Sequence, residues 1–288
     1  DQVVVLGGCP TVYDGSNLPE PSACWRPSVL KLIEGVASSG GYNPGGTNPT
    51  YFFAAVVKWT DRKGNIYWSE VSPISSIKLA NVGSAVTIKL RATPLSNKGD
   101  WYPSTYLQPK LIVLRGSAND SQVLRHISPS GTDLSLTLSP NDWYSVVSLG
   151  ESTSDSRLEL AYNTGEPQNT VVPSASVGCS ANGRIFLRLD ENKSRVLYSK
   201  PPIATRAPEF SYQTMFLDFP AEIQALSAMD GRVFAFAKKG IYTVDGQGPA
   251  RNLTGGTFAI NELTPGTGTS QPLSVIATPI GIIFANEI

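Results

Sequence analysis

The sequence predicts an all-β protein that combines a partial β-propeller with an immunoglobulin- or fibronectin-like β-sandwich. The first observation is composition, because 26 Gly and 22 Pro are scattered without a period of three between short apolar runs, as in strands joined by turns. The second is a repeat: the pattern Gly-x-[Ile/Val]-Phe occurs three times in the C-terminal half, at spacings of 48 and 50 residues. This period is typical of propeller blades, which are small antiparallel sheets.

Length and charge limit the function classes. The 288 residues can hold one large or two ordinary β domains and bury a substantial core. Lys+Arg and Asp+Glu are equal at 23 each, so no net field attracts nucleic acid, an anionic membrane or acidic substrates. The longest apolar runs, at 51–57 and 280–285, fall short of the ~20 residues of a membrane helix. We therefore expect a soluble protein.

The N-terminal segment, residues 1–45, reads as one strand at 3–6 followed by a long irregular loop. We expect it to pack on the propeller, and the Gly-dense stretch at 38–46 is the expected domain boundary. No signal-peptide pattern follows Asp1, so we expect a processed chain or a part of a longer one. Three cysteines favour reduced thiols, with a bridge between Cys9 and Cys24 as the alternative.

Residues 46–150 predict the sandwich domain. An apolar run at 51–59 ends in a turn with Asp61 and Gly64, and a second strand returns at 66–69, which together form a hairpin. Further strands separated by turn residues are expected at 74–80, 85–92, 109–115, 121–127 and 133–138. Short strands at this spacing are typical of immunoglobulin-like folds.

Residues 151–288 predict the propeller blades. The motif begins at Gly183, Gly231 and Gly281, and apolar residues recur eight and six positions before each Gly, which is the period of a strand. A third blade strand is expected at 241–244, and its equivalent at 195–199. The third copy stops soon after its Phe, so we expect an incomplete propeller with an unpaired edge. A second sandwich with similar hairpins is the alternative.

The sequence offers few candidates for catalysis. His126, the single His, lies in an alternating strand without a nucleophile elbow, and no zinc-ligand spacing occurs. Asp190 and Glu191, with Asp218, could form a glycosidase-like carboxylate pair, but 190–193 reads better as a polar turn. Calcium, phosphate-loop and dinucleotide patterns are missing from the sequence. We therefore expect no enzyme activity, no catalytic, metal or cofactor residues, and no cofactor.

Aromatic residues offer one possible contact surface. Trp101 and Tyr102 lie in an irregular loop and could bind a sugar or base. Trp59 and Trp68 flank the hairpin, where cross-strand aromatic packing is the commoner use. The remaining aromatics considered for such a surface are Trp25, Tyr106 and Trp143.

Several stretches carry a family resemblance. The most specific are the hairpin at 51–73, with its Trp-x-Asp-x-x-Gly-Asn turn and Ser-x-x-Ser-Pro end, and Tyr-Ser-Lys at 198–200 followed by Pro-Glu-Phe-Ser at 208–211. These stretches resemble the tail nozzle proteins of short-tailed bacteriophages, also called tail tubular protein B or stabilisation proteins. Weaker matches are Val12–Gly15 with Glu20 and Pro27, residues 160–166, which depart from the family at Ala161 and Glu166, residues 240–242, and residues 281–284.

The resemblance implies a virion structural protein. In that family a propeller with an immunoglobulin-like insertion forms a six-fold ring below the portal and adaptor and lines the DNA-ejection channel. It implies a homohexamer in the virion tail, assembled in the host cytoplasm, that contacts the portal, the adaptor and other tail proteins. It also implies passage of double-stranded DNA without sequence-specific binding, no membrane contact and no catalysis. Balanced charge suits such a conduit, because strong phosphate binding would retain the DNA.

Two alternatives remain open. One is a secreted or surface β-propeller module that binds or cleaves glycans, for which Asp190 and Asp218 are the candidate carboxylates. The other is an intracellular propeller scaffold for protein partners.

Overall fold

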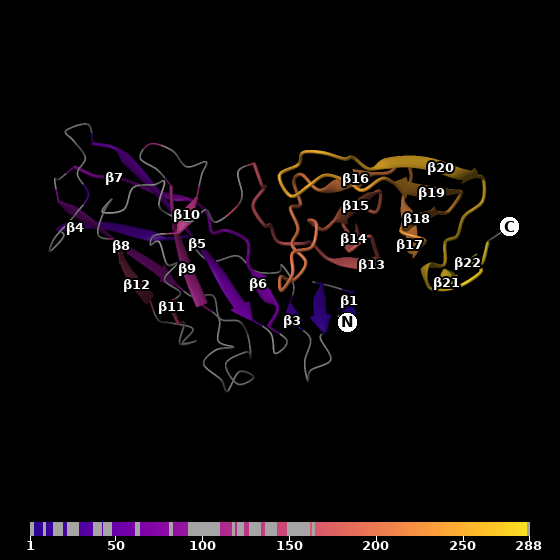
Figure 1. The fold of residues 1–288 in the computed structure, drawn as a ribbon, viewed down its shortest axis with the longest axis horizontal. Coiled ribbons are helices and arrows are strands. Elements are labelled where there is room, and N and C mark those ends of the chain that lie inside the picture. The colour runs from indigo at the N-terminus through magenta and orange to yellow at the C-terminus, as the bar shows by residue number, and fades with distance from the viewer. Residues whose placement is uncertain are drawn as a thin grey trace. The chain divides into compact units, whose positions relative to one another are not determined.

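The structure, a computed structural model, describes residues 3–7, 10–13, 20–21, 29–36, 42, 48–60, 64–80, 83–91, 110–116, 119, 124–126, 134–135, 143–148, 162 and 165–286. Its regular structure is almost entirely antiparallel β-sheet (Figure 1). The chain forms two compact units. The insert unit is Trp25–Gln168, and the repeat unit joins Asp1–Cys24 to Asn169–Ile288. Within the described ranges, no helix has the length and apolar character needed to cross a membrane.

The described residues of the insert unit form two antiparallel sheets. In the larger, β5 (Thr50–Thr60) pairs with β6 (Ile66–Trp68), β7 (Ser75–Lys78) and β9 (Lys110–Arg115), and β9 also pairs with β10 (Arg125–His126) and β11 (Leu134–Ser135). In the smaller, β8 (Ser84–Arg91) lies between β4 (Lys31–Val36) and β12 (Trp143–Ser148). The predicted hairpin at 51–69 is confirmed by the pairing of β5 with β6, and Gly64 has the left-handed φ of +84° that its turn requires.

Two serines extend this hairpin beyond β6. Ser69 donates its backbone N–H to the carbonyl of Val57 (2.9 Å), and its Oγ accepts the N–H of Val57 (2.9 Å). Ser72 repeats the arrangement on Ala55, with distances of 2.8 and 2.9 Å. Both serines are buried, so each side chain satisfies a strand donor that would otherwise lose its partner. The Ser-x-x-Ser-Pro segment is therefore part of the sheet.

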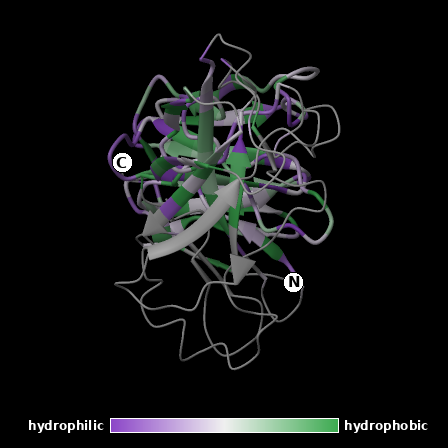
Figure 2. Ribbon diagram, turned by 90° about the vertical axis from the view of Figure 1, so that its left-hand side faces the viewer, coloured by the Kyte–Doolittle hydropathy of each residue, from purple (hydrophilic) through white to green (hydrophobic). Residues whose placement is uncertain are grey.

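Both faces of the larger sheet of the insert unit contain buried residues. Phe53, Ala55 and Val113 are buried on one face. The cluster on the other face consists of Ala54, Val56, Trp68, Val71, Ile112, Leu114 and Leu124. Tyr162 packs edge-on against Trp68, with ring centroids 6.3 Å apart. In Figure 2 hydrophobic colour follows the strands, and hydrophilic colour is more frequent in the connecting segments.

The register of the hairpin separates the positions of Trp59 and Trp68. Trp59 lies opposite Tyr67, and Trp68 lies opposite Lys58, so the two Trp residues occupy positions on opposite faces of the sheet. A one-residue difference in register places a side chain on the other face. Trp68 therefore contributes to the core.

The unit boundaries differ from those at 45/46 and 150/151 that the sequence suggested. The chain divides after Cys24 and after Gln168 instead. The reason is long-range pairing: β4 pairs along its whole length with β8, and Tyr162 packs in the core of the insert unit. Tyr42, from the Gly-dense stretch, is buried against Tyr51 with ring centroids 4.6 Å apart.

In the repeat unit, the residues that the structure describes form four antiparallel sheets. The N-terminal one is β1 (Val3–Val5), β2 (Thr11–Tyr13) and β3 (Glu20–Pro21). The first four-stranded sheet is β13 (Ala175–Ala181), β14 (Arg184–Leu189), β15 (Arg195–Tyr198) and β16 (Phe216–Asp218). The second is β17 (Ile223–Met229), β18 (Arg232–Ala237), β19 (Gly240–Asp245) and β20 (Ala259–Pro265). A short 3-10 helix, η3 (Pro272–Ser274), precedes the pair β21 (Ile276–Thr278) and β22 (Gly281–Ile283).

The first two copies of the repeat have the same register. Each opening hairpin closes in a two-residue turn, Asn182-Gly183 or Asp230-Gly231, in which both residues have positive φ. These are type I′ turns, whose twist matches that of the strands. Each first strand carries a bulge at the equivalent point, after Ala175 in one copy and after Ile223 in the other. The 48-residue spacing is therefore a structural period.

The third copy departs from the motif by one residue. Thr278 pairs with Gly281 across a turn formed by residues 279 and 280, so Gly281 is the first residue of a strand. In the first two copies the motif Gly is the last residue of the turn. The structural period from the second copy is consequently 49, and Phe284 packs on the opposite face from Phe186 and Phe234. The sequence alignment of the third motif was wrong by this shift.

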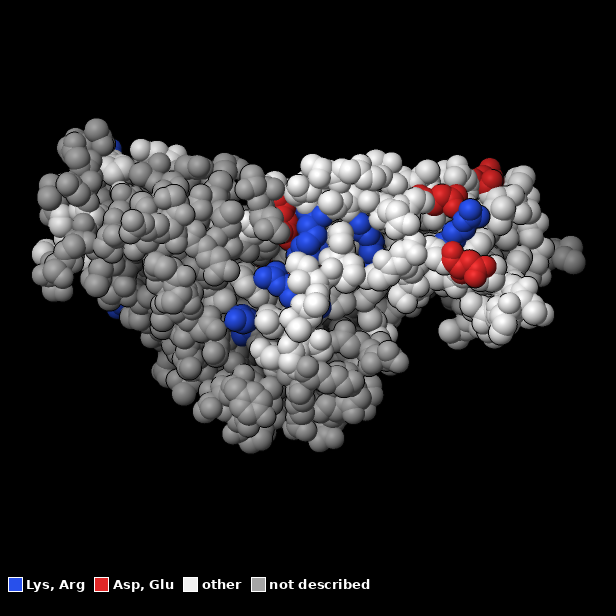
Figure 3. All heavy atoms as spheres, in the orientation of Figure 1, with Lys and Arg blue, Asp and Glu red and all other residues white. Residues whose placement is uncertain are grey.

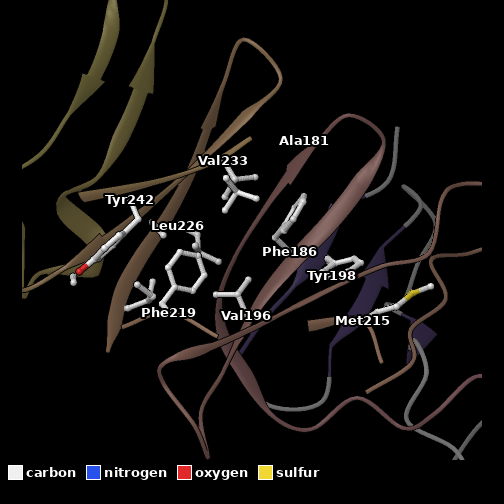
Figure 4. Close-up of a cluster of buried hydrophobic side chains, with 13 residues drawn as sticks. Ala181, Phe186, Val196, Tyr198, Met215, Phe219, Leu226, Val233 and Tyr242 are labelled. Atoms are coloured by element: carbon white, nitrogen blue, oxygen red, sulfur yellow. The ribbon is translucent and has the colours of Figure 1, made fainter. Parts of the chain in front are cut away.

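Successive sheets of the repeat unit stack face to face. Phe186 and Val196 of the first sheet point towards Leu226 and Val233 of the second (Figure 4). On its other face the second sheet packs through Phe236 against β21 and β22, with the Phe236 and Phe284 rings 5.1 Å apart at their centroids. The second sheet thus buries one face on the sheet that precedes it and the other on the pair that follows.

Candidate functional site

A pocket of about 540 Å³ lies in the repeat unit, and its volume is in the range of ligand-binding sites. Its floor is apolar and consists of Ile185 and Leu187 on β14 with Val4 and Leu6 from the N-terminal segment. Its rim carries five charged residues, which come from β14 and from two connecting segments: Arg184, Lys200, Arg206, Glu209 and Arg251. We call this site the basic pocket, because its described lining has four cations and one carboxylate.

Gly178 is the point at which the N-terminal segment packs against β13. At the equivalent place in the second sheet stands Leu226, which fills the space with a side chain. A Cβ at Gly178 would lie 2.9 Å from the Leu6 side chain and 2.8 Å from the Phe186 carbonyl. The close approach of the N-terminal segment to β13 therefore requires glycine here. Leu6 packs into this space, and Gly7 donates its N–H to the carbonyl of Ala175 (2.9 Å).

Arg184 is the most buried of the three arginines that line the basic pocket. It is 5% exposed and donates to the carbonyls of Ser199 (3.1 Å), Gln247 (3.1 Å) and Pro249. Its guanidinium carbon also lies 5.4 Å from the centre of the Phe258 ring. Burial lowers the pKa of Arg184, because its charge is compensated mainly by dipoles and ring faces.

Glu209 is the centre of the opposite side of the rim. Its two carboxylate oxygens accept from different arginines: Oε1 from Arg206 at 3.2 Å, and Oε2 from Arg251. Arg251 also donates to the carbonyl of Pro201 (2.9 Å). Lys200, 2% exposed, donates its backbone N–H to the Glu209 carbonyl (2.8 Å). These contacts tie the segment between β15 and β16 to the loop between β19 and β20.

The basic pocket is suited to binding an anion. Positive side chains surround one end and an apolar floor forms the other, which is the arrangement of a site for a ligand with an acidic and an aliphatic part. In the view of Figure 3, basic side chains reach the surface around the segment that follows β15. No group of three or more His, Cys, Asp or Glu residues that could hold a metal ion occurs within the described part of the chain.

Asp190 has a structural environment. Burial alone would raise its pKa, but hydrogen bonds from Ser176 and Ser174 and the hydrogen bond and charge of Arg188 outweigh this and lower the pKa to about 2. The carboxylate accepts from Ser174 Oγ (2.7 Å) and Arg188 (2.9 Å), and Arg188 donates in turn to the Ile223 carbonyl of the next sheet (3.2 Å). Asp190 therefore helps to join the two sheets.

Asp218 and Glu191 also form contacts with other side chains of the repeat unit. Asp218 forms a two-point ion pair with Arg195 (2.7 and 2.9 Å), and the hydrogen bonds from Arg195 lower the pKa of Asp218. Glu191 accepts the Tyr212 hydroxyl at 2.8 Å. A glycosidase general acid needs a raised pKa, so the lowered values of Asp190 and Asp218 argue against that role for either.

The other sequence candidates give little to a site. His126 lies on β10 opposite Leu114, and its side chain is outside the described residues, as are Trp25, Trp101, Tyr102 and Tyr106. Trp143 starts β12 opposite Arg91. Cys9 and Cys24 also fall outside the described ranges. Cys179 is a free thiol that packs on the cluster between the sheets, and burial raises its pKa to about 12.

Sequence reasoning missed the basic pocket. Lys200 and Glu209 lie in the two halves of the Tyr-Ser-Lys and Pro-Glu-Phe-Ser stretches, and the buried charges could have been suspected from their position among apolar residues. The ion pair between Glu209 and Arg251 could not have been predicted, because Arg251 is 42 residues away in the chain. Comparison with family models gives no match for this chain, and neither does comparison with curated proteins.

Proposed function

We propose that this protein is a structural component of a bacteriophage tail, in which the repeat unit is part of a β-propeller and the insert unit is an immunoglobulin-like domain. The protein forms a homohexameric ring, the tail nozzle, below the portal and adaptor. Double-stranded DNA passes through the ring without sequence-specific binding. The role requires neither catalysis nor a cofactor.

The observation that carries the proposal is the pair of equivalent sheets. Both are four-stranded antiparallel meanders with identical type I′ turns and bulges, and they stack face to face with β13 alongside β17. Consecutive blades of a propeller have this relation, with their first strands adjacent and their faces packed together. A free-standing sandwich built from similar hairpins has no reason to repeat the position of a bulge.

The resemblance to tail nozzle proteins gains support from the two most specific stretches. Ser69 and Ser72 in the first stretch are buried and complete the pairing of β5. Lys200 and Glu209 in the second are buried and hydrogen-bonded to each other through the backbone. The shared residues therefore have structural tasks, which is what a common fold requires of them.

An exposed apolar surface supports a role in assembly. The outer side of the β21–β22 pair and its flanks expose large aliphatic residues: Leu273, Ile276, Ile280 and Ile283. In the two preceding sheets the corresponding outer faces pack on the next sheet. Exposed aliphatic clusters of this kind mark surfaces that are covered by further protein.

The composition of purified virions tests the proposal. Mass spectrometry of phage particles from a host that carries this gene should detect the protein in the tail fraction, at about six copies per particle if the ring is a hexamer. Absence from particles that contain portal and adaptor would contradict a tail role. The glycan-binding alternative makes the opposite prediction, because it requires retention on a glycan array and no virion association.

A further inference from the structure

The basic pocket combines features that no structural role of the repeat unit requires. At the position of Gly178 the second four-stranded sheet has Leu226, whose side chain packs in the cluster between the two sheets. The volume of about 540 Å³ lies in the range of ligand sites, roughly 300–1,000 Å³. A hollow of this size beside buried charges is unfavourable for stability alone.

The charged residues of the basic pocket indicate which class of ligand it can bind. Arg206 is the most exposed of the three arginines on the rim, with 29% of its side chain accessible, and it faces Glu209 together with Arg251. Guanidinium groups bind carboxylates through parallel N–H donors, and five donors allow one Arg to serve two carboxylates. The described lining has four cations and one carboxylate, and Arg206 is the arginine most accessible to an incoming anion.

Its floor limits the ligand further. Ile185 and Leu6 are partly buried and offer apolar surface to the pocket. A multiply charged, strongly hydrated phosphate would lose its hydration over this floor without compensation. An aliphatic chain would instead gain by burial, at about 25 cal/mol per Å² of apolar surface.

We propose that the basic pocket binds a carboxylate attached to an aliphatic group, with the carboxylate at Arg206 and Arg251 and the aliphatic part on Ile185 and Leu6. Two sources share this chemistry: a free aliphatic acid, and the C-terminal residue of a protein chain that ends in Leu, Ile or Val. The proposal is independent of the tail role, since it concerns a site within one copy of the repeat unit.

Calorimetric titration of the full chain with octanoate tests the aliphatic acid. A second titration uses an acetylated pentapeptide that ends in Leu, with either a free or an amidated C-terminus, and a third uses inorganic phosphate. We expect saturable binding of octanoate or of the free-carboxylate peptide, and at least about tenfold weaker binding of the amidated peptide and of phosphate. Binding of octanoate alone identifies a free acid, and binding of the peptide alone identifies a chain terminus.

Three variants locate the ligand. Arg206→Gln should weaken binding about tenfold or more, because it removes a charged donor from the rim. Ser180→Phe should abolish binding, because Ser180 is an exposed residue of the lining and a ring there fills the pocket without changing a charge. Arg232→Gln is the matched control, since Arg232 is an exposed arginine on the second sheet, and it should bind as the wild type does.

Thermal unfolding of each variant without ligand shows whether it is folded before its binding is compared. If neither octanoate nor the free-carboxylate peptide binds saturably, the proposal is wrong. Equal binding by the wild type, Arg206→Gln and folded Ser180→Phe would also overturn it, as would phosphate binding as tight as that of octanoate.

Discussion

The sheets β13–β16 and β17–β20 have the same strand order, turns and bulges, yet equivalent positions serve different purposes. Arg184 is 5% exposed and donates hydrogen bonds to three backbone carbonyls. Arg232 is the equivalent residue 48 positions later, and its side chain is 66% exposed and forms an ion pair with Asp245. Gly178 leaves room for the Leu6 side chain, whereas Leu226 packs in the cluster between the sheets. A repeated backbone therefore fixes the architecture, and substitutions on it give equivalent positions different surroundings.

The largest effect is expected in the shared core between the sheets. Phe186→Ala should lower the free energy of unfolding by about 3–5 kcal/mol, because Phe186 is buried between two sheets and its removal leaves a cavity. Phe234 is the equivalent residue of the second sheet and is only partly buried. Phe234→Ala should therefore cost about 1–2 kcal/mol. Urea unfolding of both variants measures the difference, and equal losses would contradict the unequal burial of the two copies.

Replacement of the equivalent arginines, Arg184 and Arg232, tests the difference between the two sheets most directly. Arg184→Ala should lower the free energy of unfolding by about 2–3 kcal/mol, because three carbonyls lose a charged donor. Arg232→Ala should change it by less than about 1 kcal/mol, because its ion pair with Asp245 is exposed. The comparison uses urea unfolding at one pH and salt concentration. A loss for Arg232→Ala as large as that for Arg184→Ala would show that the copies are not distinguished in this way.

Substitution of either turn glycine should lower the stability of the protein, but by different amounts. Gly183→Ala and Gly231→Ala each force a non-glycine residue into a left-handed conformation, at φ of +72° and +74°, which costs about 1 kcal/mol or more. A Cβ at Gly231 would also lie 2.6 Å from the Asn182 side-chain oxygen, whereas one at Gly183 would meet Pro202 at 3.1 Å. We expect Gly231→Ala to be the more destabilising by melting temperature. The reverse order would contradict the contact between the two turns.

Asp190 provides a small pH-dependent effect that is specific to the first sheet. Its pKa in the folded state is about 2, below the usual ~3.9 of an unfolded chain, so its contribution is present above pH 4 and is lost as the pH falls towards 2. Asp190→Asn should cost about 1 kcal/mol at pH 6 after allowance for solvent screening, and the gap to the wild type should close between pH 4 and 2.

Chemical unfolding at several pH values measures this gap. Asp230→Asn is the control, because an exposed residue in a type I′ turn tolerates Asn and should change stability by less than about 0.5 kcal/mol. A wild-type advantage over Asp190→Asn that persists unchanged at pH 2 would contradict the lowered pKa.

Local patterns allowed the β class, the hairpin at 51–69 and the opening hairpins of the first two copies to be predicted. Asn182-Gly183 and Asp230-Gly231 specify type I′ turns within a few residues, so no distant partner was needed. The shift in the third copy was not predictable from the motif. Gly281 has a φ of +149° at the start of a strand. Glycine adopts this conformation as readily as that of a turn, so its presence does not define the register.

The basic pocket and the unit boundaries depend on contacts between distant residues. Arg184 bonds to carbonyls at Gln247 and Pro249, more than 60 residues away, and backbone carbonyls leave no trace in residue types. The pairing of β4 with β8 likewise spans about 50 residues and moves the boundary towards the N-terminus. Composition and periodicity describe segments, and these features arise only when segments pack.

The central claim is that this chain belongs to a ring of identical subunits built from stacked blades. Electron microscopy and native mass spectrometry of the protein expressed from its complete reading frame test that claim most directly. We expect closed rings with six-fold averages and a central channel, and a mass about six times that of the subunit. A strictly monomeric species at micromolar concentration, with no rings on the grids or in purified tails, would contradict it.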